Sequence, residues 1–345
     1  MLSYFKESTE SGVLKKSVII SIAGLITSVL ANFAWANGVT ARIVNGEVAS
    51  SGDIPWQVAI LHDLSDPFNS QSCGGTILNE EWVLTAAHCY GPDAPVTYVA
   101  AGMTNLNQIP SEALTSEVTW IVHEGYSPES SDNDIALLRL KTPFDLSACP
   151  NCMAIDPVTS RNESEAMPEG TYGVVSGWGS LVAGLDPENV YSPDLMYAGV
   201  YIISCTASPA LYSPEVITNN MICGGAPDFS RDACLGDSGG PLVVAGPDGA
   251  SVLLAGLVSW GNGCAVQGYP NIYTRVANYE NWIKSKMNSD CCDQGTDSRF
   301  ADNNGNNFTA TSSSSGGGGS FSTLIVMLIG SLLVLRSRLM KRCRR

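Results

Sequence analysis

The sequence predicts an all-β fold that ends in a single helix. Short runs rich in apolar and β-branched residues recur along the chain, and glycine and proline separate them. These runs are residues 58–62, 75–78, 82–85, 135–140, 173–175, 241–244 and 253–260. Apolar residues at helical spacing first appear within residues 279–287, at Tyr279, Trp282, Ile283 and Met287. We therefore expect strands through the body of the chain and one helix near its end.

The charge of the chain argues against binding to nucleic acid. The 345 residues include 33 acidic and 18 basic side chains, and six of the basic ones lie in the last ten positions. Residues 43–320 carry only 8 basic residues against 31 acidic ones. A body with this acidic excess repels phosphate backbones and is kept in solution by its charge.

The N-terminus has the pattern of an export signal. Lys15 and Lys16 precede an apolar run over residues 18–30, and Ala34-Trp35-Ala36 is a small-x-small cleavage site. We expect residues 1–36 to be a signal peptide. An uncleaved membrane anchor is the alternative.

A glycine-rich turn around Ser238 is the strongest chemical motif. Residues 232–241 read Asp-Ala-Cys-Leu-Gly-Asp-Ser-Gly-Gly-Pro. Such a turn exposes a serine and aims backbone N–H groups at one point, and here the groups of Gly236 and Ser238 are placed to hold an oxyanion. A serine hydroxyl also needs a base to take its proton. By itself the motif also fits an ordinary turn.

The base and its partner are found upstream. His88 stands beside Cys89 after an apolar run, and Asp134 enters a buried strand. The order His88, Asp134, Ser238 resembles the triad order of the chymotrypsin/trypsin family of serine endopeptidases. The resemblance covers about residues 43–286 and implies two six-stranded antiparallel β-barrels, with the active site in the cleft between them.

The resemblance also assigns activation. Arg42-Ile43-Val44-Asn45-Gly46 matches the site at which precursors of this family are cut. Residues 37–42 would then be a pro-segment, and the new ammonium of Ile43 would pair with the buried carboxylate of Asp237. A lone charge in an apolar interior is costly, so each group needs the other.

Specificity is expected to depend on Asp232. It lies six residues before Ser238, where the family has the floor of its primary pocket, and a carboxylate there selects Arg and Lys. The resemblance adds Ser259, Trp260 and Gly261 as a short strand that pairs with the substrate. Trypsin keeps this pocket open with two glycines. Gly261 retains one, whereas the other position is occupied by Asn271, which we expect to narrow the pocket unless the loop over residues 265–270 shifts and turns it away.

Eleven cysteines indicate an oxidising compartment. The resemblance implies three bridges, and it places a fourth family bridge at Gly173 and Val244, where it is lost. The implied pairs are Cys73–Cys89, Cys205–Cys223 and Cys234–Cys264. Cys149, Cys152, Cys291 and Cys292 have no assigned partners: two local bridges, a tie between the two segments and a zinc site all remain open.

No cofactor or metal is expected. The segment after Gly102 begins with Met103, where a calcium site of the family would need a carboxylate. His62 and His123 have no place in the triad, and we assign them structural roles.

The C-terminus changes composition. Residues 288–320 are rich in Asn, Ser and Gly and predict a flexible linker, residues 321–335 are apolar or small, and residues 336–345 are basic. Glycines, apolar helix and basic cluster together resemble the GlyGly-CTERM sorting tag of Gram-negative bacteria. This resemblance implies a transient membrane anchor, a rhomboid-type protease that removes it, and type II secretion. The alternative is a permanent inner-membrane tail anchor.

Together these patterns predict an exported, monomeric serine endopeptidase, made as a zymogen, whose protease domain spans residues 43–287. Its partners would be protein or peptide substrates and an activating protease. Three alternatives remain: altered primary specificity caused by Asn271, a binding module on the same fold without catalysis, and a surface-anchored adhesion protein.

Overall fold

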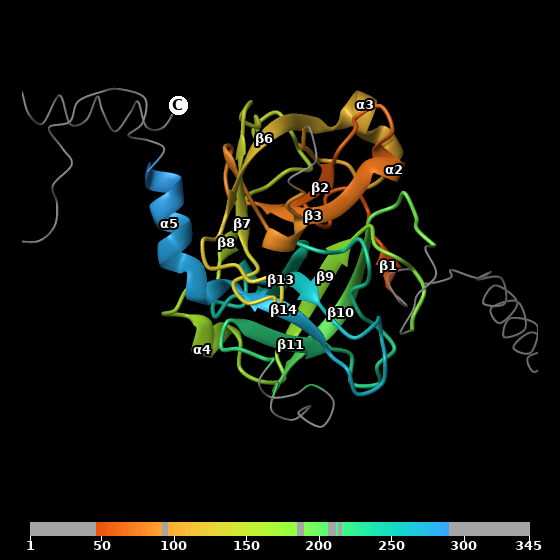
Figure 1. Ribbon diagram of the computed structural model, residues 1–345. Coiled ribbons are helices and arrows are strands. Elements are labelled where there is room, and N and C mark those ends of the chain that lie inside the picture. The colour runs from red at the N-terminus through yellow and green to blue at the C-terminus, as the bar shows by residue number, and fades with distance from the viewer. Residues whose placement is uncertain (1–45, 92–95, 185–189, 206–211, 213–215, 290–345) are drawn as a thin grey trace, which may run out of the picture. The chain divides into compact units, whose positions relative to one another are not determined.

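The computed structural model describes residues 46–91, 96–184, 190–205, 212 and 216–289 (Figure 1). The chain divides into two units, residues 1–276 and 277–345. The expected signal peptide, pro-segment, apolar helix and basic tail lie outside the described residues. So does the expected linker from residue 290 on, whereas its first two residues, 288 and 289, are helical and belong to the terminal helix.

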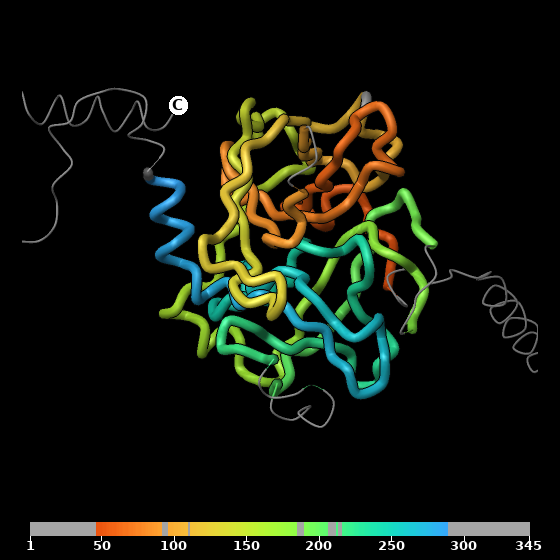
Figure 2. The backbone as a smooth tube through the Cα atoms, in the orientation of Figure 1, coloured from red at the N-terminus to blue at the C-terminus, as the bar shows by residue number. Residues whose placement is uncertain are grey.

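The first unit begins with a closed six-stranded antiparallel barrel, drawn in orange and yellow in Figure 2. Hydrogen bonds join its strands in the order β2-β3-β4-β7-β6-β5, and β5 closes the ring onto β2. The strands are β2 (Gln57–Leu61), β3 (Gln71–Ile77), β4 (Trp82–Thr85), β5 (Tyr98–Ala101), β6 (Leu114–Val122) and β7 (Ala136–Leu140).

A second antiparallel barrel follows in the same unit. Its strands run β10-β11-β14-β13-β12-β9, and pairing of β9 with β10 closes it. They are β9 (Tyr172–Gly177), β10 (Met196–Ile203), β11 (Met221–Gly225), β12 (Pro241–Ala245), β13 (Val252–Trp260) and β14 (Asn271–Arg275). Two short strands extend this sheet, β1 (Glu47–Val48) beside β10 and β8 (Asp156–Pro157) parallel to β13. The two barrels that the resemblance implied are therefore confirmed.

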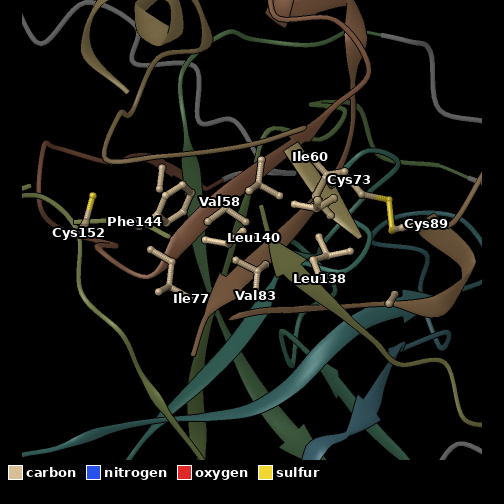
Figure 3. Packing of buried hydrophobic residues seen from close by; sticks show 14 residues of the cluster. Val58, Ile60, Cys73, Ile77, Val83, Cys89, Leu138, Leu140, Phe144 and Cys152 are labelled. Atoms are coloured by element: carbon tan, nitrogen blue, oxygen red, sulfur yellow. A yellow bond between two sulfur atoms is a disulfide. The ribbon is translucent and has the colours of Figure 1, made fainter. Parts of the chain in front are cut away.

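The first barrel is closed around a dense apolar core. Every residue of β2 and of β4 is buried, and Figure 3 shows side chains from several strands meeting inside the barrel. Val58, Ile60, Ile77, Val83 and Leu138 are among those with no exposed surface. Burial of each such side chain stabilises the fold by about 1.5–3 kcal/mol relative to exposure.

All seven expected strand runs fall on strands, but the sequence pattern did not indicate β5, β6, β10, β11 and β14. Two of these show why. Strand β6 places Thr115, Glu117 and Thr119 among its apolar residues and keeps most of its side chains half-buried or exposed. Strand β10 contains Gly199, over which the ring of Tyr172 lies so closely that a Cβ there would collide with it. These segments form strands because neighbouring strands of the barrel hydrogen-bond to their backbones, although their own side chains show no strand pattern.

Five short helical turns connect the strands of the first unit. They are α2 (Pro67–Ser70), η1 (Ala87–Cys89), η2 (Leu106–Gln108), α3 (Ile109–Glu112) and α4 (Glu163–Ala166). A further turn, η3 (Val276–Tyr279), leads into the helix α5 (Glu280–Ser289) of the second unit. The terminal helix expected at residues 279–287 is thus confirmed. Within the part of the chain that the structure describes, no helix is both long enough and apolar enough to cross a membrane.

Four disulfides are present among the described residues. Three are the pairs that the resemblance implied, Cys73–Cys89, Cys205–Cys223 and Cys234–Cys264. The fourth joins Cys149 to Cys152, so that these two cysteines form a local bridge and have no free thiolates for a zinc ion. Cys291 and Cys292 lie outside the described residues. Gly173 and Val244 are cross-strand partners in β9 and β12, as expected for positions that have lost a bridge.

Candidate active site

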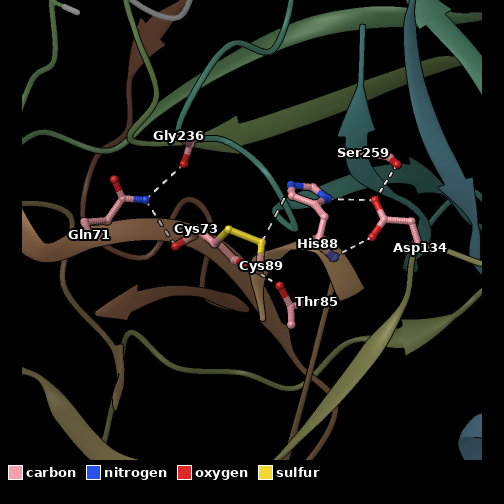
Figure 4. Close-up of a disulfide and its surroundings, with 9 residues drawn as sticks. Gln71, Cys73, Thr85, His88, Cys89, Asp134, Gly236 and Ser259 are labelled. Atoms are coloured by element: carbon pink, nitrogen blue, oxygen red, sulfur yellow. Dashed lines mark hydrogen bonds and ion pairs between the residues drawn. A yellow bond between two sulfur atoms is a disulfide. The ribbon is translucent and has the colours of Figure 1, made fainter. Parts of the chain in front are cut away.

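His88 and Asp134 form a tightly bonded pair on the first barrel (Figure 4). His88 lies in the turn η1, directly after β4, and Asp134 lies just before β7. Nδ1 of His88 is 2.8 Å from Oδ2 of Asp134, and the His88 backbone N–H donates to Oδ1, also at 2.8 Å. Because a carboxylate only accepts, Nδ1 carries the hydrogen and Nε2 is left as the basic nitrogen.

The second barrel completes the surroundings of Asp134. The Ser259 hydroxyl donates to Oδ2 at 2.5 Å, and the Thr274 hydroxyl donates to the backbone carbonyl of Asp134 at 2.6 Å. Ser259 lies at a bulge in β13 between Val258 and Trp260, and such a bulge redirects a side chain. Asp134 is 1% exposed. The sequence indicated Ser259 only as a substrate-binding residue and gave no signal for Thr274.

The loop before Asp134 is held in a strained conformation. Ser131 and Asn133 have positive φ angles of 52° and 55°. Between them, Oδ1 of Asp132 accepts hydrogen bonds from the Thr218 hydroxyl at 2.7 Å and from the Asn220 amide at 3.0 Å. The second barrel therefore fixes the loop that carries the catalytic candidate Asp134.

The turn that carries Ser238 is pinned between the two barrels. The Ser238 carbonyl accepts from the Gly74 N–H of β3 at 2.8 Å, and the Gly239 N–H donates to the Val258 carbonyl of β13 at 2.8 Å. Gly239 has φ of +72°, and a Cβ there would collide with the Thr85 hydroxyl. Glycine is therefore required at this position, and the half-buried Ser238 is held by bonds to β3 on one side and to β13 on the other.

Gly236 and Asp237 shape the same turn. Gly236 has φ of +96°, a region open to glycine. Asp237 is fully buried and accepts from the Gly179 N–H at 2.7 Å and the Cys234 N–H at 2.8 Å. Burial raises the pKa of the Asp237 carboxyl to about 6, against which these two bonds act. Arg42 and Ile43, the expected activation residues, lie outside the described residues.

A pocket of about 360 Å³ opens beside Ser238. Its lining includes Ser259, Trp260, Gly261 and Asn271, as the sequence led us to expect. The wall is braced by the Cys234–Cys264 disulfide and by Tyr212, whose hydroxyl donates to the Pro270 carbonyl and accepts from the Asn262 N–H. The Tyr212 ring also meets the Trp260 ring edge-on at 5.2 Å.

Asp232 lies behind this lining and is 2% exposed. Its carboxylate accepts from the backbone N–H groups of Ala233 at 3.1 Å and Ala265 at 3.0 Å. Burial raises the pKa of Asp232 to about 8, while these bonds and the Asn271 amide act in the opposite direction.

Asn271 points into the pocket, so the alternative in which it turns away is wrong. It is 5% exposed, and its amide nitrogen donates to the Ala233 carbonyl at 2.7 Å. Its Oδ1 lies where a Cβ on Gly261 would be, so the side chain crosses from one wall of the pocket to the other. Both the Ala233 carbonyl and the Asp232 carboxylate accept hydrogen bonds, which fixes the amide nitrogen on their side.

Two closed β-barrels that bring a histidine–aspartate pair against a serine turn define the class of chymotrypsin-like proteins. The sequence model of the trypsin family matches residues 43–283. The chain is similar to trypsin V-B of Rattus norvegicus, with 35% identity over 247 residues that cover 71% of this chain and 89% of that protein. Ovochymase of Halocynthia roretzi is also 35% identical over 71% of the chain, which spans only 16% of that longer protein.

Among solved structures, the chain resembles neuropsin, described as a serine protease expressed in the limbic system of mouse brain. The TM-score is 0.59 at 30% identity, and the match covers 70% of this chain and 98% of that one. The chain belongs to the trypsin family of serine-type endopeptidases.

Proposed function

We propose that the protein is a secreted endopeptidase that hydrolyses peptide bonds after Arg or Lys through Ser238, His88 and Asp134. The observation that carries the proposal is the hydrogen-bonded chain from Ser259 through Asp134 to His88. His88 follows two residues after Ala86, which packs against Gly239 of the serine turn. This arrangement orients one imidazole nitrogen as a base and buries the carboxylate that stabilises its charged form.

The proposed reaction has two steps. Ser238 Oγ attacks the scissile carbonyl while Nε2 of His88 takes the hydroxyl proton, and the backbone N–H groups of Gly236 and Ser238 hold the oxyanion. His88 then gives the proton to the leaving amine, which leaves an acyl group on Ser238. A water molecule repeats the sequence, with His88 again as the base, and releases the acid product.

The proposed preference for Arg and Lys rests on Asp232. A buried carboxylate at the base of the pocket gains most from a cationic side chain and would be left poorly satisfied by an apolar one. Asn271 modifies this preference, because its side chain occupies part of the pocket and its amide lowers the pKa of Asp232.

We further propose that the protein is exported as a zymogen, that cleavage after Arg42 activates it, and that the segment from residue 321 is a transient anchor of the GlyGly-CTERM type. Support comes from the oxidised cysteines, the export pattern before residue 37 and the tail composition. Mass spectrometry of the secreted form should find its N-terminus at Ile43 and its C-terminus within or just beyond the Ser/Gly tract. An intact tail ending in Arg345 would reject the sorting tag.

The catalytic roles are tested by active-site labelling. A peptidyl phosphonate ending in an Arg mimic should modify Ser238 of the activated wild type, located by mass spectrometry of the digested protein. Ser238→Ala should lose labelling and hydrolysis, and His88→Ala should lower kcat by more than about 100-fold. Ser127→Ala, an alteration of a hydroxyl bonded to Glu129 on the surface, is the matched control and should keep both activities.

The outcome separates the enzyme from its alternatives. If activated wild type binds peptides but neither hydrolyses them nor takes the label, the chain is a binding module on this fold. If a chain without residues 321–345 retains full peptidase activity, the activity does not depend on the tail, and the tail gives no reason to regard the protein as a surface-anchored adhesion protein.

A further inference from the structure

Gln71 is the first residue of β3 and makes a contact that the proposed mechanism does not use. Its side-chain nitrogen donates to the Gly236 carbonyl at 3.0 Å and to the Cys73 carbonyl at 3.1 Å (Figure 4). An amide nitrogen has two hydrogens, so one group serves both acceptors. Because both neighbours are carbonyl oxygens, only the nitrogen end of the amide fits between them.

The contact fixes one side of Gly236. The other side is fixed by the Leu235 carbonyl, which accepts from the buried Ser180 backbone N–H at 2.7 Å. A peptide unit is planar and trans, so the Gly236 N–H points away from the Leu235 carbonyl. The Ser180 bond therefore fixes the peptide plane that carries the Gly236 N–H, and the Gln71 bond fixes the plane that follows it.

Glycine by itself does not hold this conformation. With no Cβ, Gly236 has access to many φ and ψ values, and its φ of +96° is one of them. Rotation about Gly236 would swing its carbonyl away from Gln71 and break that bond. The Gln71 amide thus holds the peptide plane that follows Gly236, while the Ser180 bond holds the plane that carries its N–H, so that rotation about Gly236 is restrained from both sides.

The restraint is anchored in the first barrel. Gln71 is half-buried, and its backbone N–H donates to the carbonyl of Pro67, the first residue of α2. Its second acceptor belongs to Cys73, which is bridged to Cys89 next to His88. One side chain therefore connects the strand that supports the histidine to the turn that presents the oxyanion donors.

We infer that Gln71 is a positioning residue for the oxyanion site, holding the Gly236 N–H in the direction that a developing oxyanion needs. This inference rests on the proposed function. Preorganised donors contribute to the transition state and much less to substrate binding. Loss of the Gln71 donor should therefore lower kcat while leaving KM nearly unchanged.

The test compares two variants with wild type, all activated in the same way. Gln71→Met keeps the length of the side chain and removes the donor, whereas Gln71→Glu places a charged acceptor against two carbonyls. We expect kcat to fall about tenfold in the first, less than the roughly 100-fold cost of losing a direct oxyanion donor, and further in the second. Gln108→Met removes a half-buried amide that caps η2 by accepting from the Asn105 N–H, and it is the matched control, with kcat unchanged.

A pair of inhibitors separates positioning from general structural damage. A peptide aldehyde forms a tetrahedral adduct with the serine and places an oxygen in the oxyanion site, whereas the matching peptide alcohol does not. Gln71→Met should bind the aldehyde about tenfold more weakly, in line with the fall in kcat, and the alcohol within about twofold of wild type.

Unchanged kcat and aldehyde affinity in Gln71→Met would overturn the inference, as would equal weakening of aldehyde and alcohol. Either result leaves the proposed function standing if wild type is active. Failure of wild type to hydrolyse peptides or to be labelled at Ser238 would instead reject the proposed function itself.

Discussion

Asn271 alters what the pocket carboxylate requires from a substrate. In an open pocket, a buried Asp232 would have only backbone donors and would depend on the cation of the substrate. Here the Asn271 amide, which donates to the neighbouring Ala233 carbonyl, lowers the pKa of Asp232, and the same side chain fills space beside Gly261. A basic side chain must therefore share the pocket with Asn271, which reduces both the room and the electrostatic gain on binding.

Asn271→Gly should consequently raise kcat/KM for peptides with Arg or Lys before the cleaved bond by about tenfold. Asp232→Ser should abolish the preference for basic residues, because no carboxylate is left to be neutralised. Both effects are measured with a peptide library and with matched Arg, Lys and Leu substrates. Asn107→Gly, at an exposed position of η2, is the control and should leave specificity unchanged.

The contrary result is also specific. If wild type cleaves mainly after Leu, Phe or Ala, Asp232 does not act as the pocket floor, although the roles of the triad would be unaffected.

At the level of single residues, the sequence could predict those whose chemistry is tied to a local motif. Ser238 and Asp237 lie in one turn, His88 follows a recognisable apolar segment, and Asp134 comes directly before one. Gln71 could not be predicted, because its role depends on meeting a carbonyl 165 positions away in the chain. Such a contact exists only after the barrels have brought β3 and the serine turn together.

Among the elements, the connection between β6 and β7 has the clearest consequence for the site. Its residues Ser131 and Asn133 adopt positive φ angles, which cost about 1 kcal/mol or more for residues other than glycine. Asp132 offsets this cost by accepting from Thr218 and Asn220 in the second barrel. The hydrogen bonds of the Asp132 carboxylate therefore hold the loop in its strained conformation.

Asp132→Ala should release that loop. We expect the free energy of unfolding to fall by about 1.5–3 kcal/mol, the range for hydrogen bonds to a charged group. We also expect kcat to fall, because Asp134 follows two residues later and orients His88. Urea denaturation and steady-state kinetics measure the two effects. Asp228→Ala removes a surface carboxylate that bonds only within its own turn, to Ser230, and provides the comparison.

If Asp132→Ala destabilised the protein no more than Asp228→Ala and left kcat at the wild-type value, the loop would not need this anchor.

Elements are also where sequence and structure differ most. Strand β4 was predicted with its observed bounds, because three large apolar residues in a row are followed by the β-branched Thr85. Strand β14 was not, although all but its last residue are buried, because Asn271 and Thr274 interrupt the apolar pattern. Those two polar residues are the ones that the structure places at the pocket and at Asp134. The apolar pattern that predicts a strand is therefore interrupted at the residues of β14 that contribute to the proposed site.

For the whole molecule, the fold makes one polar site from parts of both barrels. Strand β3 lies against β12 and β2 against β9, and glycines allow the closest approach: a Cβ on Gly74 would lie 3.1 Å from Cα of Gly240. The residues proposed for catalysis need both barrels. His88 and Asp134 come from the first barrel, whereas the second barrel supplies the Ser259 and Thr274 hydroxyls that bond to Asp134. Neither half alone contains a complete set, so the barrels must be docked before the site exists.

The last prediction concerns activation, and it follows from the buried Asp237. Folding raises the pKa of its carboxyl from 3.8 to about 6. Between these values the folded chain binds the proton more tightly than the unfolded chain does. The contribution of Asp237 to the free energy of unfolding therefore decreases as pH rises from about 4 to about 6, and the loss remains at neutral pH.

Cleavage after Arg42 should remove this loss. The new Ile43 ammonium is proposed to pair with Asp237, which would stabilise the charged carboxylate and lower its pKa. In a Ser238→Ala background, which prevents self-digestion, cleaved protein should therefore be more stable than uncleaved protein. The difference should grow as pH rises to about 6 and level off between about pH 6 and 7 at roughly 3 kcal/mol, corresponding to a shift of about two pKa units.

Urea denaturation of the two forms, with cleavage by an added Arg-specific protease, measures this difference. Asp232, whose raised pKa also makes stability depend on pH, is present in both forms, so only the part of its contribution that depends on the charge of Asp237 differs between them. Asp237→Asn provides the control, because without a titrating carboxyl the difference between cleaved and uncleaved protein should no longer vary with pH over this range. If the Asp237-containing pair shows the same stability difference at pH 4 and pH 7, the ammonium does not reach Asp237 and activation must use another contact.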